Sequence, residues 1–416
     1  MGVLKPGVTC WRRARVKRAA FLVASDAYFT AALEAMRKAQ HSILLLGWTF
    51  DPRTRLTPDG HLGASDPDEV GRLLLHLSQA RPQLDIRLLI WKAALPISAS
   101  QQFFPQAARG WFSGSRIKFR LDDQIPFGAC HHQKVLVIDD RVAFCGGGDI
   151  GVDRWDSWLH LQDDLRRILP SHAFHAPRHE SMMMVDGAAA RDLGELFRQR
   201  WRRSGDDAPP PPSGDGPDPW PAHVTPHLTE GEIGIARTEP AANGRRRVEE
   251  IQALTLDCIA RARRTIYLEN QYFTSPAVTE ALASRLREAG GPEVVLVTTA
   301  HAPSWFDRMT MDRARGTMIA RLRAEDREGR FRAFAPTTSG GRDIIVHSKC
   351  SLFDDRIVRI GSANLNNRSL GFDTECELAI EGVSASARHG IDAFRDRLIG
   401  HFLGVADAQV AQACAE

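Results

Sequence analysis

Apolar residues recur along the chain with helical spacing and then run into short, almost wholly apolar segments that end at glycine or polar residues. This order of a helix followed by a strand is found at 29–46 and again at 251–268. In each half, a second helix, a second strand and a third short strand follow. Alternating helices and buried strands are typical of an α/β layer with partly parallel strands. The expected strands are 43–46, 86–90 and 117–121 in the first half, and 265–268, 294–297 and 331–334 in the second.

The third strand of each half leads to the same polar pattern, H-x-K-x4-D-x6-G-[GS]. The first copy begins at His132 and ends at Gly146-Gly147, and the second begins at His347 and ends at Gly361-Ser362. A lone H-x-K recurs by chance in many chains of this length. Five matching positions that occur twice indicate a duplicated site.

Each copy of the pattern is expected to form a β-hairpin. In the first copy, an apolar and β-branched run precedes the turn signal Asp139-Asp140-Arg141, and a second apolar run follows it. Residues two apart on a strand share a face. The reacting side chains would therefore lie in pairs, His132 beside Lys134 and His347 beside Lys349.

A histidine beside a lysine suits chemistry on an anionic phosphoryl group. The lysine stabilises charge on the non-bridging oxygens, while the histidine attacks phosphorus or protonates the leaving oxygen. A displacement with a covalent intermediate needs a nucleophile on one side of phosphorus and an acid on the other. Two such hairpins must therefore face each other, which accounts for the duplication.

A neutral histidine nucleophile needs a partner on its second ring nitrogen. The candidates are the carboxylates that open a later strand in each half, Glu180 and Glu375, with Glu377 as the competitor for the second role. The partner sought first for His132 is Glu180, in the same half. No metal and no other cofactor is expected, because the repeated residues offer too few carboxylates for a two-cation site and the lysines stand where cations would act. His131 would point to the opposite strand face, where a structural role is expected.

A segment rich in Pro, Gly and Asp separates the two copies, from Ser204 to Pro219. Such a composition cannot form a core element and predicts an extended linker or a surface crossing. The chain is therefore divided into a first half at 1–203, a crossing segment at 204–246 and a second half at 247–416.

The composition is that of a soluble globular protein, with 43% hydrophobic and 25% charged residues in 416 and a formal net charge of +3. So small a charge does not call for a polyanionic partner, and no nucleic acid is expected. Seven scattered cysteines without a C-x-x-C pair argue against a disulfide framework or a zinc site and favour a reducing cytoplasm. We find no signal-peptide pattern and no apolar run near the roughly 20 residues that span a bilayer. A lipid substrate would be met from the membrane surface.

The duplicated pattern resembles the phospholipase D superfamily, and the similarity extends over nearly the whole chain. Phrases that resemble its bacterial and eukaryotic-type lipid branch are Asp153–Asp156, Ile266–Phe273 and Gly361–Ser369. The resemblance implies an α/β fold of two similar halves, each a mixed sheet flanked by helices, packed as a pseudo-twofold pair. One active site would lie at the seam, where the motif regions 126–153 and 341–368 meet.

The resemblance also implies roles for the repeated residues. His132 would be the nucleophile that forms a phosphohistidine, and His347 the general acid and then the base. The symmetry of the sequence does not itself make that choice. The residues expected to hold the phosphoryl oxygens are Lys134, Lys349 and Asn364.

Further residues complete the expected site. The first half has Asp149 where the second has Asn364, which departs from the simplest repeat. Asp139 and Asp354 complete the catalytic motif, but they sit at the hairpin turns and are expected to be structural. Three aromatic residues that follow strands or the motif either contact a lipid headgroup or close the core: Trp48, Trp155 and Tyr272.

The activity implied is that of a phospholipase D, an enzyme that hydrolyses or transfers the phosphatidyl group of a glycerophospholipid at a membrane surface with water or an alcohol as acceptor. Two alternatives remain open. One is a cardiolipin synthase-like phosphatidyltransferase, whose acceptor is another lipid, and the other is a metal-independent nuclease. We expect a cytoplasmic monomer that meets the inner face of the membrane peripherally.

Overall fold

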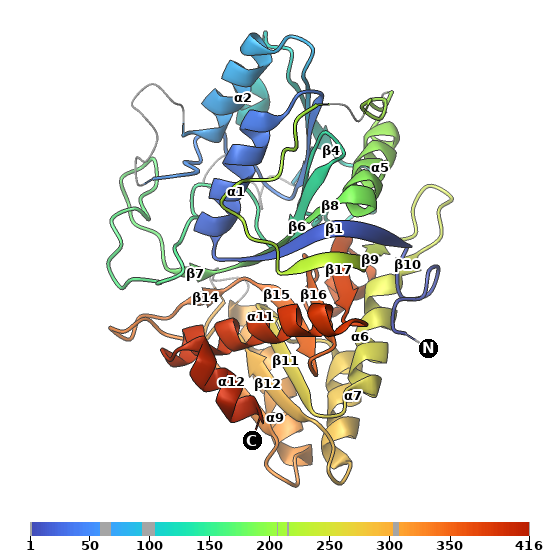
Figure 1. Ribbon diagram of the computed structural model, residues 1–416, viewed down its shortest axis with the longest axis vertical. Coiled ribbons are helices and arrows are strands. Elements are labelled where there is room, and N and C mark those ends of the chain that lie inside the picture. Colours follow the sequence, from blue (N-terminus) through green and yellow to red (C-terminus); the bar gives the residue numbers. More distant parts are fainter. Residues whose placement is uncertain are drawn as a thin grey trace.

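A computed structural model describes residues 2–58, 68–93, 105–205, 207–213, 216–302 and 308–415. One 15-stranded mixed sheet runs through these residues, and helices cover its faces (Figure 1). The strands pair in the order β13-β12-β11-β15-β16-β17-β9-β1-β8-β6-β5-β2-β3-β4, with β10 added beside β9. The α/β architecture of two halves predicted from the sequence is confirmed.

The first half contains eight strands and four helices among the described residues. The strands are β1 (Arg12–Val23), β2 (Ser42–Gly47), β3 (Asp85–Trp91), β4 (Lys118–Asp122), β5 (Val135–Ile138), β6 (Val142–Gly146), β7 (Arg178–His179) and β8 (Ser181–Asp186). The helices are α1 (Ser25–Lys38), α2 (Val70–Ala80), α4 (Pro105–Trp111) and α5 (Gly187–Arg203).

The second half repeats this plan. Its strands are β9 (Leu228–Glu239), β10 (Val248–Glu249), β11 (Thr265–Asn270), β12 (Glu293–Val297), β13 (Phe331–Phe334), β14 (Ile345–Val346), β15 (Lys349–Phe353), β16 (Ile357–Gly361) and β17 (Glu375–Glu381). Its helices are α6 (Glu250–Arg261), α7 (Pro276–Arg287), a π-helical turn η1 (Arg308–Asp312), α9 (Arg313–Glu325), α10 (Asn367–Gly371), α11 (Ala385–Leu403) and α12 (Asp407–Ala415).

The strand order reads the same outward from the centre in both directions. From the antiparallel pair of β1 and β9, the first half continues β8-β6-β5-β2-β3-β4 and the second continues β17-β16-β15-β11-β12-β13. In each half the three outermost strands are parallel, as the alternation of helices and strands predicts. The two halves are therefore related by a pseudo-twofold axis that passes between β1 and β9.

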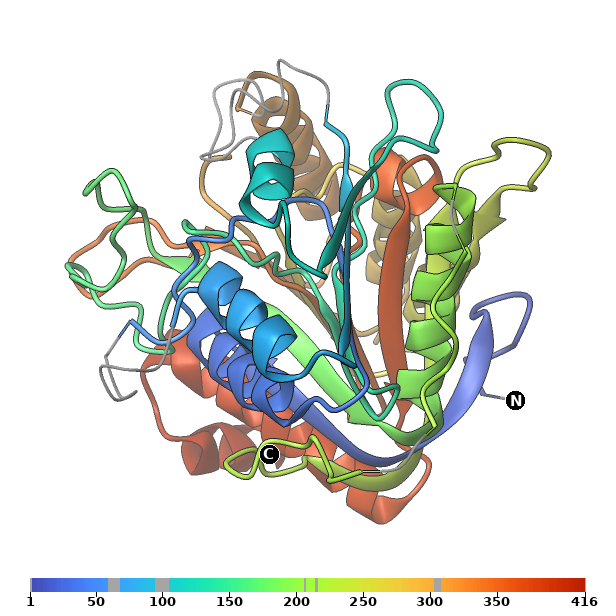
Figure 2. The same ribbon diagram turned by 90° about the horizontal axis from the view of Figure 1, so that it is seen from above.

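The inner faces of the two half-sheets share one core. Val135 and Cys145 of the first half belong to the same buried cluster as Cys350 and Ile360 of the second, and apolar residues of α5 and α11 complete it. The outer faces have separate cores, under α1 and α2 in the first half and under α6 and α7 in the second. Figure 2 shows α1 and α2 on one side of the first half's strands and α5 on the other. Burying the inner faces brings the two hairpins together.

Two central strands lie where the sequence patterns gave no strand. β1 occupies the arginine-rich N-terminal segment, and β9 lies inside 204–246, the segment interpreted as a linker and crossing. From Leu228 onward this segment is a strand of the sheet, paired with β1 and β17. Both strands have polar residues on their exposed ends, which hid the apolar pattern of their buried parts.

Both motif hairpins form as predicted, β5 with β6 and β15 with β16. The first turn, Asp139–Arg141, has Asp139 and Asp140 at φ 53°, a left-handed conformation that Asp tolerates in a tight turn. In the part of the chain that the structure describes, no helix has the length and hydropathy needed to cross a membrane.

Candidate active site

The two motif histidines lie just before their hairpin strands, in segments that hydrogen-bond to the opposite half. The backbone N–H of His132 donates to the carbonyl of Thr374 over 2.9 Å, and that of His347 donates to the carbonyl of His179 over 2.8 Å. The short strands β7 and β14 pair in parallel beside the second of these bonds. The histidines were expected on the strands themselves. They lie instead where the chain crosses the seam, because their backbone groups pair across it.

Each histidine is held by a glutamate of the other half. The Nδ1 atom of His132 lies 3.0 Å from Oε2 of Glu375, and Nδ1 of His347 lies 2.5 Å from Oε2 of Glu180. The prediction that Glu180 partners His132 is wrong. The physical reason is the backbone pairing across the seam, which places the residue after Thr374 beside His132 and the residue after His179 beside His347.

The carboxylates fix the orientation of both imidazoles. A carboxylate accepts the N–H on Nδ1, so the lone pair of each neutral ring is on Nε2, the nitrogen that can act on a substrate. Burial, with Lys134 and Lys349 nearby, holds the pKa of His132 well below its ordinary value. Burial together with Lys349 does the same for His347. Both rings are therefore neutral before the reaction, as a nucleophile must be.

The glutamates carry raised pKa values. Burial raises the pKa of Glu375 to about 8 and that of Glu180 to about 7, against the opposing effect of the motif lysines. The pKa of Lys349 is lowered to about 7 by burial. Burial disfavours the charged form of each of these groups, which raises the pKa of a carboxyl and lowers that of an ammonium. A phosphoryl anion between the lysines would favour their charged form.

The ammonium group of each motif lysine turns back toward the histidine of the same motif. The Nζ atom of Lys134 donates to the carbonyl of His132 over 2.9 Å and lies 3.3 Å from the carboxylate of Asp149. The Nζ atom of Lys349 donates to the carbonyl of His347 in the same way. Each lysine is thus fixed beside the histidine of its own motif, as predicted.

Asp149 and Asn364 occupy equivalent places and behave differently. Asp149 accepts the backbone N–H of Trp48 and pairs with Lys134. Asn364 is buried, and its Oδ1 atom has no hydrogen-bond partner among the described residues. The second half therefore offers a buried amide at this position, whereas the first offers a carboxylate whose charge is paired with Lys134.

The motif aspartates bind backbone away from the histidines. The carboxylate of Asp139 accepts the backbone N–H groups of Gln40, His41 and Ser42. That of Asp354 accepts those of residues 263 to 265. Each carboxylate joins its hairpin turn to the helix-to-strand connection before β2 or β11, which is a structural task.

The glycines of the motif let the next strand approach. A Cβ on Gly146 would lie 2.5 Å from the carbonyl oxygen of Ser181, and one on Gly361 would lie 2.6 Å from that of Cys376. The following position differs between the halves. Ser362 donates its hydroxyl to Glu375, whereas Gly147 places no hydroxyl beside Glu180.

Two of the remaining sequence candidates lie away from the histidines. The Trp155 ring is buried in the outer core of the first half and stacks under Arg166. Glu377, the competitor of Glu375, pairs with Arg359 on the neighbouring strand. By contrast, Trp48 lies edge-on to His132 with ring centroids 6.4 Å apart, so it lines the site.

Tyr272 lies near charged residues that border the second histidine. Its hydroxyl accepts from the side-chain amide of Gln271 over 3.1 Å, and its ring is partly exposed. Tyr272 follows β11, two residues after Asn270.

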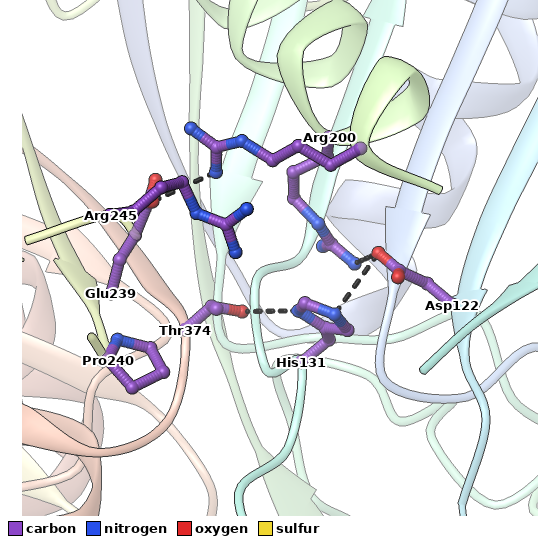
Figure 3. Close-up of a pocket in the computed structure, with 8 residues that line it drawn as sticks. Asp122, His131, Arg200, Glu239, Pro240, Arg245 and Thr374 are labelled. Atoms are coloured by element: carbon purple, nitrogen blue, oxygen red, sulfur yellow. Dashed lines mark hydrogen bonds and ion pairs between the residues drawn. The ribbon is translucent and has the colours of Figure 1, made fainter. Parts of the chain in front are cut away.

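His131 faces a different pocket from His132 (Figure 3). Its Nδ1 atom lies 3.1 Å from the hydroxyl of Thr374 and its Nε2 atom 3.1 Å from Asp122, which pairs with Arg200. Burial lowers the pKa of His131 to about 4. This neutral ring ties the segment before His132 to Thr374, and so positions the reacting histidine from behind.

Sequence reasoning missed one pair of charges at each end of the seam. In the first half, Arg178 lies 3.7 Å from Asp153, and in the second half Asp373 lies 2.7 Å from Arg368. These residues stand at equivalent places of the repeat, two before each glutamate and seven after the first motif glycine, but with the signs of the charges exchanged. The sequence carried the signal, which an alignment of the two halves would have revealed.

Comparison with known proteins agrees with this architecture. The family described as "Phospholipase D" matches residues 35–213, and the family described as "Cardiolipin synthase, PLD-like domain" matches residues 255–396. Together these matches cover most of both halves. The chain is a member of the phospholipase D superfamily.

Among relatives of this superfamily, phospholipase D A of Dictyostelium discoideum is 26% identical over 85% of the chain, and phospholipase D alpha 1 of Nicotiana tabacum is 24% identical over 90%. The chain spans only 32% and 63% of their lengths. A crystal structure of phosphatidylserine synthase from Haemophilus influenzae Rd KW20 covers 92% of the chain with a TM-score of 0.62 and 14% identity, and 86% of that chain is matched. This likeness shows a common fold.

Proposed function

We propose that this superfamily member is a phospholipase D-type phosphodiesterase that cleaves a glycerophospholipid and passes its phosphatidyl group to water or an alcohol through a phosphohistidine. The observation that carries the proposal is the pair of neutral histidines, each held by a glutamate of the other half and each beside a fixed lysine. This arrangement supplies a nucleophile, an acid and two cations for one phosphodiester.

The first step follows from the tautomers. Nε2 of His132 attacks phosphorus, and the bond from phosphorus to the headgroup oxygen breaks. Binding of the phosphodiester anion favours the charged form of His347, whose Nε2 then takes up a proton from water and gives it to the leaving oxygen. Lys134, Lys349 and the amide of Asn364 hold the non-bridging oxygens, whose charge grows in the transition state. Glu375 accepts the hydrogen bond of a ring that becomes positively charged on phosphorylation.

In the second step His347 takes a proton from the acceptor, whose oxygen attacks phosphorus and releases His132. The product is a phosphatidic acid when the acceptor is water and a new phospholipid when it is an alcohol. Because the same atoms serve both acceptors, the balance between hydrolysis and transfer depends on which hydroxyl reaches the site.

Burial and the motif lysines lower the pKa of both histidines, and the other nearby charges differ in sign. Arg178 and Arg154 act on His347, whereas Asp373 acts on His132. The assignment of His132 as the nucleophile rests on the family resemblance, and this difference in charge offers a way to test it.

The decisive experiment is to trap the phosphoryl-enzyme. The protein is mixed with vesicles of a phospholipid labelled at phosphorus, quenched within a turnover and digested, and the label is mapped. We expect acid-labile label on His132. Label on His347 would reverse the roles, and absence of label and of turnover with every phospholipid tested would refute the lipid assignment.

Two further arms separate the alternative functions. Added glycerol or phosphatidylglycerol yields a transfer product if the enzyme accepts alcohols, and predominance of a lipid acceptor over water identifies a cardiolipin synthase-like activity. Degradation of single-stranded DNA with a chelator present, while vesicles stay intact, would identify a nuclease.

A further inference from the structure

Three histidines outside the catalytic motifs converge next to the seam. His160 lies in the connection between β6 and β7, His179 lies on β7, and His401 lies near the end of α11. One ring nitrogen of each lies within 4.8 Å of the ring nitrogens of the other two. The site is distinct from the reacting pair, although His179 precedes Glu180 in the chain.

Two carboxylates determine which nitrogens of the first two rings carry protons. Nδ1 of His160 lies 2.8 Å from Asp156, and Nε2 of His179 lies 3.0 Å from Glu269. A carboxylate accepts, so each of these nitrogens bears the hydrogen. The other nitrogen of each neutral ring, Nε2 of His160 and Nδ1 of His179, then carries a lone pair.

These two lone pairs face each other across 3.4 Å. Two acceptors at that distance repel unless a cation lies between them. Zinc binds histidine nitrogen at about 2.0–2.1 Å with tetrahedral angles, which places two ligand nitrogens about 3.4 Å apart. The observed separation therefore matches a metal-bound pair and exceeds the length of a normal hydrogen bond.

The carboxylates are fixed in the orientation that this role needs. Asp156 also receives the backbone N–H of Arg178 over 2.7 Å and lies 3.2 Å from the guanidinium of Arg167. Glu269 receives the hydroxyl of Tyr267 over 2.7 Å. A histidine ligand whose second nitrogen donates to a fixed carboxylate is the usual outer arrangement of protein metal sites.

The third histidine favours a bound metal ion over a proton shared between His160 and His179. One proton between His160 and His179 would use two nitrogens and leave His401 without a task. The His401 ring lies 5.1 Å from that of His160 and packs against Trp158 with centroids 4.0 Å apart. One of its ring nitrogens lies within 4.8 Å of those of His160 and His179.

We propose that His160, His179 and His401 bind a divalent transition-metal ion, zinc in the first place, with the fourth position left to water. Imidazole nitrogens suit zinc, and three of them form a stable site. The cysteine pattern argued against a zinc site from sequence. Histidines from three distant segments form no spacing motif, so only the fold brings them together.

The metal would have a structural role beside the reaction centre. It would join the segment around His160 and the helix α11 to β7, whose His179 carbonyl accepts the backbone N–H groups of His347 and Ser348. Removing the metal would loosen this support for His347. The inference does not depend on the proposed lipid chemistry, because metal binding is measured directly.

The test begins with the full chain purified without a histidine tag. We expect about one zinc per chain by elemental analysis, and X-ray absorption with nitrogen neighbours at about 2.0 Å. Dialysis against a strong chelator should lower Tm by a few degrees, and zinc should restore it. If the purified chain holds no stoichiometric metal and neither chelator nor zinc changes its Tm, the proposal is overturned. A proton shared between His160 and His179 would then account for their short separation.

Variants locate the ion. His401→Phe keeps the aromatic packing against Trp158 and should lower zinc affinity at least tenfold, and His160→Gln should do the same. The matched control is His172→Asn, which replaces an exposed histidine at a positive φ that Asn tolerates, and should retain the metal. Equal metal content in all three variants would contradict the site. Cobalt in place of zinc provides a visible spectrum that reports the same ligands if a variant folds poorly.

Discussion

The two halves of the molecule have the same backbone plan, but the charges beside their histidines are reversed. In the first half, Arg178 lies two residues before Glu180, the partner of His347. In the second half, Asp373 lies two residues before Glu375, the partner of His132. Duplication accounts for the shared hairpins, and the exchanged charges give the two histidines different surroundings on a symmetric backbone.

A smaller difference lies beside the glutamates. The hydroxyl of Ser362 donates a hydrogen bond to Glu375. The equivalent residue, Gly147, lies beside Glu180 and has no side chain that could donate. Asp149 is neutralised by Lys134, whereas its counterpart Asn364 keeps a free amide oxygen among the described residues. These differences concern side chains that lie beside the motif residues.

The largest expected effects come from replacing each of the two motif histidines with alanine. His132→Ala should remove the phosphoryl-enzyme and lower turnover by about 10⁴-fold, because the nucleophile is lost. His347→Ala should retain label on His132 when the leaving group is p-nitrophenol, which needs no acid. Rapid-quench labelling with that substrate measures both. If His347→Ala alone abolished labelling, the assigned roles of the two histidines would be reversed.

The raised glutamate pKa values predict a pH-dependent stability. In the folded protein Glu375 keeps a proton on one carboxyl oxygen up to about pH 8 and accepts the N–H of His132 with the other, whereas the unfolded chain releases that proton near its ordinary pKa. Stability is therefore lost as pH rises from about 5 to 8, by about 3 kcal/mol from this group. Glu375→Gln should flatten that slope in urea unfolding.

Glu180→Gln serves as the matched variant in the other half. The pKa of Glu180 is raised to about 7. The loss of stability that this group causes with rising pH should therefore be complete about one pH unit earlier than for Glu375, and it should amount to about 2 kcal/mol. Identical slopes for wild type and both variants would show that neither carboxyl holds its proton in the folded state.

Neutralising one member of the reversed charge pairs should affect the halves differently. Arg178→Gln should slow substrates with alcohol leaving groups by about tenfold and p-nitrophenyl substrates much less, since it weakens His347 as an acid. Asp373→Asn should slow both kinds, since it acts on the nucleophile. The measurement is the turnover rate of each variant with a series of substrates whose leaving groups differ in pKa. Equal losses for Arg178→Gln across the series would exclude an effect through the acid.

The smallest expected effect is at the serine that only the second half has. Ser362→Ala removes one hydrogen bond to Glu375 and should slow phosphoryl-enzyme formation by about fivefold, which corresponds to about 1 kcal/mol. Ser181→Ala, a hydroxyl that pairs with Ser348 and not with a glutamate, is the control. A Ser362→Ala rate equal to that of wild type would remove this residue from the comparison.

The sequence by itself determined the repeat. Apolar runs located β2, β3, β11 and β12, and the duplicated motif identified both hairpins, because these are local patterns of burial and turn chemistry. The same patterns did not locate β1 and β9, whose polar ends interrupt the apolar alternation.

Only the tertiary structure decided which residues act together. Glu375 partners His132 and Glu180 partners His347 because backbone bonds cross the seam, a fact with no trace in spacing along the chain. The meeting of His160, His179 and His401 has the same origin. Local sequence specifies elements through short-range burial and propensity, whereas a site at a pseudo-twofold axis is assembled from segments that only long-range packing brings into contact.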